Sequence, residues 1–227
     1  MKKTTLPLLL YAIAGLTLAL GQDSAGSPKP PALHRAPAMS SWTVTYAYAE
    51  EKVPPGTPAP GYLANSVRTL TVTKTGKTYH EETTLISGKK RDKWVLNNLQ
   101  LESVVDSPSI IPIPPSTPQE PQPDYSDYSH TDFKGLEWVT MSNYTGVKSS
   151  EGKPAYEFEI EHGGQKVSAL LDVTSQLPLS STEGGTTCTY VFNSPPTSPL
   201  VLPPNFQSVL DAYKRGMEGL KFHPSPP

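Results

Sequence analysis

Four stretches near the carboxyl end of the chain read as strands joined by short turns, and this pattern restricts the possible folds most. In Pro154–His162, Tyr156, Phe158 and Ile160 share one face, and three glutamates share the other. Such period-two alternation is typical of a strand with one buried face. Turns marked by glycine or polar residues are expected at 163–164, 173–176 and 184–185, which leaves further strands at 165–172, 177–182 and 186–192. The sequence therefore predicts an antiparallel β-meander over residues 154–192.

The first half of the chain predicts more strands of the same kind. Trp42, Val44, Tyr46 and Tyr48 alternate with smaller residues. The segments 66–74 and 78–86 flank a short turn and are expected to form a hairpin, since Thr and Val favour strands. Further strands are expected at 93–105, as one or two strands, and at 136–147 around Trp138. The fold class is therefore mainly β.

The amino terminus predicts export. Lys2 and Lys3 precede an apolar run from Leu6 to Leu20, and small residues lie at its exit, at Ala19 and Gly21. This order is typical of a cleavable signal peptide, expected here at residues 1–21. An uncleaved anchor is the alternative, although the run is short for a membrane span. We expect a soluble periplasmic or extracellular protein with no stable membrane insertion after cleavage.

Composition narrows the functional classes. Without residues 1–21, 17 basic residues face 21 acidic ones, so the chain lacks the positive excess that phosphate backbones require, and no nucleic-acid partner is expected. Cys188 is the only cysteine, which rules out an intramolecular disulfide. Stability must therefore come from the packed interior.

The organisation along the chain is predicted to be one ordered domain with unordered ends. A disordered, Pro-rich leader is expected at 22–40, a single β-rich domain at 41–222 and a disordered tail at 223–227. The segment 107–129 is expected to be a long Pro-rich loop, since proline cannot donate to a β ladder. After Pro203-Pro204, apolar residues recur at helical spacing and predict one amphipathic helix; they are Phe206, Val209, Leu210, Tyr213, Met217 and Leu220.

Several short motifs of the carboxyl-terminal third carry a family resemblance. They are Ala169-Leu170-Leu171-Asp172, Leu177-Pro178-Leu179, Thr189-Tyr190-Val191-Phe192 and Leu202-Pro203 with Phe206. In this order the segment from Lys153 to Tyr213 resembles the periplasmic lipoprotein carriers of the LolA, LolB and RseB type. The resemblance implies a strongly curved antiparallel sheet, an incomplete barrel whose concave face is plugged by helices. It also implies a cavity for acyl chains or a lipidated peptide.

The sequence contains only weak signals for catalytic or metal-binding groups. Asp124, Asp127, His130 and Asp132 lie close in sequence, but they lack the recurrent oxygen spacing of a calcium loop, so a solvated acidic loop is the favoured interpretation. The glutamates of 157–161 could pair for glycoside hydrolysis, yet the same spacing arises on any solvated strand face. We therefore expect a protein that is not an enzyme and needs no cofactor.

Large aromatic residues on separate strands are the remaining functional candidates. They either form an ordinary core or line an apolar cavity for a lipid or a hydrophobic peptide; they are Trp42, Tyr46, Trp94, Trp138, Tyr156 and Phe158. The sequence thus predicts an exported, non-catalytic binding or carrier-like protein, and the expected partner is a lipid, a lipoprotein or an envelope protein. One alternative is an envelope interaction module that docks through the loop 107–129. Another is a secreted hydrolase.

Overall fold

The computed structural model describes residues 31–49, 61–97, 99–114, 128 and 131–221. The predicted signal peptide, most of the predicted leader, the tail at 223–227 and most of the loop 107–129 lie outside these residues. Everything below concerns the unit that begins at Pro31.

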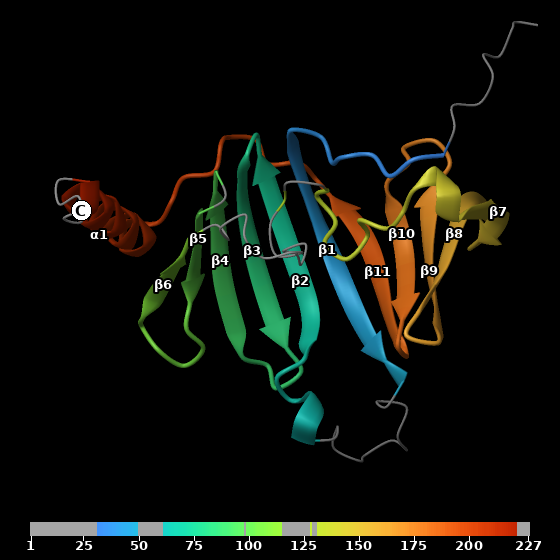
Figure 1. Ribbon diagram of the computed structural model, residues 1–227, viewed down its shortest axis with the longest axis horizontal. Coiled ribbons are helices and arrows are strands. Elements are labelled where there is room, and N and C mark those ends of the chain that lie inside the picture. The colour runs from blue at the N-terminus through green and yellow to red at the C-terminus, as the bar shows by residue number, and fades with distance from the viewer. Residues whose placement is uncertain (1–30, 50–60, 98, 115–127, 129–130, 222–227) are drawn as a thin grey trace, which may run out of the picture. The chain divides into compact units, whose positions relative to one another are not determined.

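The described part of the chain forms one antiparallel sheet of eleven strands with one α-helix (Figure 1). The strands are β1 (Met39–Tyr48), β2 (Val67–Thr75), β3 (Thr78–Leu85), β4 (Lys90–Leu96), β5 (Leu99–Ser103), β6 (Ile110–Ile113), β7 (Tyr144–Ser150), β8 (Lys153–His162), β9 (Gln165–Asp172), β10 (Pro178–Glu183) and β11 (Thr186–Asn193). The helix is α1 (Pro204–Lys221), and 3₁₀ turns lie at η2 (Gly61–Leu63) and η3 (Met141–Asn143).

Two meanders meet at the middle of this sheet. The strand order is β6-β5-β4-β3-β2-β1-β11-β10-β9-β8-β7, so β1 pairs with β2 on one side and with β11 on the other. The β1–β11 pairing runs from Ser41 opposite Asn193 to Tyr48 opposite Thr186, and it joins the two halves of the chain. The sheet curls but does not close, because β6 and β7 have no strand partner on their outer sides among the described residues. The predicted meander at 154–192 and the predicted fold class are both confirmed.

One face of the sheet is concave and holds the main core. A single apolar cluster joins Val95 of β4 to Phe158 of β8, which lie seven strand positions apart, and only a curled sheet brings such distant strands to one cluster. Phe133 lies at the centre of this cluster, with its ring 5.3 Å from that of Trp42 and 6.1 Å from that of Tyr190. Tyr128 and residues 131–139, here called the covering segment, supply four buried apolar side chains that fill the concave face.

The opposite face carries hydroxyl side chains and the helix. Thr43 and Thr71 lie side by side on β1 and β2, with their hydroxyls 3.1 Å apart. Helix α1 packs at the β5 and β6 end, where Phe206 and Leu210 contact Trp94 and Leu101. The family resemblance implied that helices plug the concave face. In this structure α1 lies on the opposite face, and a loop segment fills the concave one. Within the described residues, no helix has both the length and the apolar character to cross a membrane.

The segment 136–143 also differs from expectation. The alternation around Trp138 predicts a strand, but β7 begins only at Tyr144. Backbone N–H groups of Leu136, Val139 and Asn143 each donate to the carbonyl three residues earlier, so this segment is a succession of turns. Because these turns satisfy their own backbone groups, the segment can cover the core without pairing to a strand.

Candidate functional site

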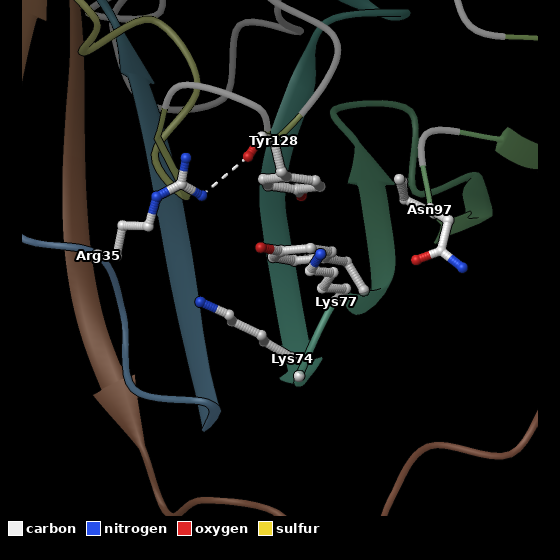
Figure 2. A pocket seen from close by; sticks show the side chains of 8 residues that line it. Arg35, Lys74, Lys77, Asn97 and Tyr128 are labelled. Carbon is white, nitrogen blue, oxygen red and sulfur yellow. Dashed lines mark hydrogen bonds between the residues drawn. The ribbon is translucent and has the colours of Figure 1, made fainter.

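An open pocket lies beside the concave core, next to the β2–β3 hairpin turn. Its volume is about 590 Å³, and its lining residues are Arg35, Lys74, Gly76, Lys77, Tyr79, Val95, Asn97 and Tyr128. Figure 2 shows Arg35 and Asn97 on opposite sides of the pocket, with Tyr128, Lys77 and Lys74 between them. A second hollow, of about 20 Å³, lies against Trp42 and Tyr46 and has space for little more than one water molecule.

A buried carboxylate, that of Asp132, supports the floor of the pocket. Its Oδ2 accepts hydrogen bonds from the backbone N–H of Ala36 and from Nζ of Lys74, both at 2.8 Å. Its Oδ1 accepts from the hydroxyl of Tyr79 at 2.6 Å and lies 3.6 Å from the guanidinium of Arg35. A buried charge is tolerated only when it is paired and hydrogen-bonded, and this arrangement meets that condition.

A second buried carboxylate, Glu81 of β3, lies on the same sheet face. It accepts a hydrogen bond from the hydroxyl of Tyr128 at 2.7 Å, pairs with Lys93 at 3.3 Å and is contacted by Lys134. Burial alone would raise the pKa of Glu81, but the ammonium groups of Lys134 and Lys93 outweigh burial, so the pKa lies below its ordinary value. Glu81 is therefore ionised at neutral pH and ties the covering segment to the sheet through Tyr128 and Lys134.

Two stacked tyrosines form the wall between these networks. The rings of Tyr79 and Tyr128 are 3.8 Å apart and nearly parallel, at 6°. Burial, with the neighbouring carboxylates, raises the pKa of both hydroxyls. Both tyrosines therefore stay neutral and present apolar ring surface and O–H donors.

The chain before β1 completes the pocket and is held by a distant turn. Gln176, in the β9–β10 turn, accepts from the backbone N–H of Ala32 at its Oε1 and from the N–H of His34 at its carbonyl. The guanidinium of Arg35 then donates to the carbonyl of Tyr128 at 2.9 Å (Figure 2). These contacts fix residues 32–36, which belong to the segment predicted to be a disordered leader, along one side of the pocket.

Positive charge is concentrated here. Among the described residues, the two networks and the pocket rim contain two carboxylates, Asp132 and Glu81, and five basic side chains: Arg35, Lys74, Lys77, Lys93 and Lys134. The whole chain has a net charge of −2. The charge balance of the described side chains at the site is thus opposite in sign to that of the whole chain.

The aromatic residues proposed from the sequence fall into two groups. Trp42 and Phe158 are buried in the concave core, and Tyr46, Trp138 and Tyr156 pack against it. Trp94 lies on the opposite face, where its ring is 4.4 Å from that of His80 and 6.2 Å from that of Phe206. None of the six lines the 590 Å³ pocket. Whether any of them contacts a ligand stays a prediction.

The other sequence candidates have structural partners. Glu157 pairs with Lys148 at 2.9 Å, and Lys166 contacts Glu159, so these glutamates make cross-strand ion pairs on the outer face. Asp132 belongs to the buried network, while Asp124, Asp127 and His130 lie outside the described residues. Among the residues that are described, no group of three or more His, Cys, Asp or Glu could hold a metal ion.

The pocket itself was not found by sequence reasoning, although a signal exists. Lys74 continues the inward-facing parity of Leu70 and Val72 along β2, and Glu81 does the same after Tyr79 on β3. A charged residue at an inward position of a strand needs a buried partner or a ligand. That rule points to Lys74 and Glu81, but the sequence does not show which residues meet them.

Comparisons with known proteins add little to this geometry. No family model and no curated protein matches the chain. Among solved structures, it is similar to the lipoprotein LppX of Mycobacterium tuberculosis, at 10% identity and a TM-score of 0.40, over 73% of this chain and 90% of that one. It is also similar to PNGF-II, at 8% identity and a TM-score of 0.33, over 74% of this chain and 30% of that one. Likeness at this level says nothing of what the chain binds.

Proposed function

We propose that this protein is an exported, non-catalytic binding or carrier-like protein that takes a lipid or another amphiphile in the pocket beside its concave core. The size and lining of the pocket carry the proposal. Small-molecule sites usually enclose about 300–1,000 Å³ and combine apolar or aromatic walls with a few polar groups. The 590 Å³ pocket has this composition, with Val95 and the stacked tyrosines beside Lys74 and Asn97.

The pocket is built on a rigid frame, which suits binding. Tyr79 is held by Asp132, and Tyr128 is held by Glu81, so neither ring needs to be ordered when a ligand arrives. Pre-ordered walls reduce the entropy that binding costs. An apolar chain can lie along the tyrosine rings and Val95 while its polar end stays at the open rim.

A fluorescent fatty acid tests this function. Titration of delipidated, refolded protein should give saturable binding, and Lys77→Trp should weaken it because the bulky ring enters the pocket. Val191→Trp is the matched control, since Val191 is exposed on the opposite face. Absence of saturable binding for fatty acids and lipopeptides alike would refute the carrier function.

Export is proposed on the pattern of residues 1–21 alone. Expression of the full chain in a bacterium should yield a secreted or periplasmic product whose measured mass matches a chain that begins at Gln22. A product that keeps residue 1 and sediments with membranes would contradict this part.

The alternative docking function through the loop 107–129 also stays a prediction. Tyr128, near the end of this loop, is buried against Tyr79 and is therefore not exposed for docking. Deletion of 115–127, which leaves Tyr128 in place, should abolish partner capture without lowering the unfolding temperature if the loop docks a partner.

A further inference from the structure

The charges around the pocket identify the class of ligand that it favours. All three ionisable side chains that line it, apart from the two tyrosines, are basic: Arg35, Lys74 and Lys77. The tyrosine pKa values are raised, so their rings add no negative charge. The lining thus presents positive charge and neutral donors.

Among the described residues, one carboxylate, that of Asp132, lies beneath the pocket. Asp132 is 1% exposed, and both of its oxygens are already occupied by donors. It is paired with Arg35 and Lys74, and within the described part of the chain it makes no ion pair with Lys77. The charge of Lys77 is therefore available to whatever fills the pocket.

Lys77 is the cation best placed to meet a ligand. It follows Gly76 in the hairpin turn, its side chain is exposed, and among the described residues no hydrogen bond or ion pair involves it. Lys74 is buried and uses two donors, on Asp132 and on the carbonyl of Ala36 at 2.9 Å. An ammonium group has three N–H donors, which leaves one at the pocket floor.

The geometry points to an anionic oxygen group, of the phosphate or carboxylate kind, bound between Arg35 and Lys77 above Lys74, as the polar end of the ligand. Charge-assisted hydrogen bonds of ammonium and guanidinium groups to such oxygens are the strong ones. The tyrosine rings and Val95 then contact the attached apolar chain. This inference rests on the proposed function and specifies its substrate class.

Three probes of known chemistry test the inference by titration calorimetry at low salt, below the concentration at which micelles form. Dodecyl phosphate carries the anion and the chain, dodecyl maltoside carries the chain with a neutral head, and inorganic phosphate carries the anion alone. We expect dodecyl phosphate to bind at least tenfold more tightly than either of the others. Added salt should weaken the binding of dodecyl phosphate, because it screens the lysine charges.

Charge reversal locates the anion. Lys77→Glu should weaken the binding of dodecyl phosphate by about tenfold or more, since two unit charges about 4 Å apart interact appreciably even in water. Lys90→Glu is the matched control: Lys90 is exposed at the start of β4, opposite Thr84, far along the strand from Val95. It makes the same change in net charge and should alter binding less than twofold.

The outcomes separate the two claims. Equal binding of the neutral and anionic amphiphiles, unchanged by Lys77→Glu, overturns the anionic inference and leaves the proposed function standing. Equal binding of inorganic and dodecyl phosphate supports the anion site and overturns the carrier function. Binding of none of the three overturns both.

Discussion

Replacement of Asp132 by alanine should be among the most damaging single changes in the protein. The substitution removes the carboxylate that four groups share as their partner. These groups are the N–H of Ala36, Nζ of Lys74, the hydroxyl of Tyr79 and the guanidinium of Arg35. The side chain of Lys74 is only 7% exposed and would keep a single acceptor, the carbonyl of Ala36. Removing one partner of a buried ion pair typically costs about 3–5 kcal/mol.

Urea denaturation followed by tryptophan fluorescence measures this cost. Asp132→Ala should lower the free energy of unfolding by about 4 kcal/mol, with an unchanged dependence on urea concentration. The double variant Lys74→Met with Asp132→Leu removes both charges and should recover at least half of the loss. The exposed pair of Lys148 and Glu157 supplies the control, since Lys148→Ala should cost less than about 1 kcal/mol. A loss below about 1 kcal/mol for Asp132→Ala would refute the reasoning, because the network would then not hold the floor.

Three further predictions concern other parts of the fold. Phe206→Ala should lower the free energy of unfolding by about 3–5 kcal/mol in urea, because Phe206 is buried against Trp94, whereas Val201→Ala, at an 82% exposed position, should change it by less than about 0.5 kcal/mol. Gly76→Ala should lower the melting temperature, because its φ of +62° disfavours a side chain, and Gly216→Ala in α1 should raise it; equal signs would contradict this. In the folded protein the pKa of Glu81 lies below its ordinary value of 4.5, so its contribution to stability is present above pH 4.5 and is lost as the pH falls through the folded pKa. Glu81→Gln should therefore flatten the fall in melting temperature between pH 5 and 3. An unchanged slope would contradict this prediction.

The strands were predictable because their signal is local. The alternation of Pro154–His162 and the turns at 163–164 and 184–185 each depend on neighbouring residues, and the structure confirms β8, β9, β10 and β11 within one or two residues. β6 (Ile110–Ile113) is the exception, because it lies within the segment 107–129 that was expected to be a loop. It contains Pro112, and it is an edge strand, which is where sheets accommodate proline.

The covering segment and the pocket were not predictable because their partners are distant in sequence. The alternation around Trp138 suits a strand, but residues 136–143 form turns with their own backbone hydrogen bonds, and only residues 144–150 pair with β8. Asp132 meets Lys74 and Tyr79, more than 50 residues earlier, so a sequence reading takes it for a solvated acidic residue. The aromatic candidates Trp42 and Phe158 were expected either to form an ordinary core or to line an apolar cavity. Both lie in the core cluster, where the covering segment, with Phe133 at its centre, packs against them.

The location of bound ligand tests the central claim most directly. Amide chemical shifts of isotopically labelled protein, followed during titration with dodecyl phosphate, should change in a saturable way at Gly76, Lys77 and Asn97 around the pocket rim. Amides of the outer face, such as that of Thr189, should not move. Saturable shifts on the outer face with an unperturbed rim would contradict the account, because the ligand would then bind away from the 590 Å³ pocket.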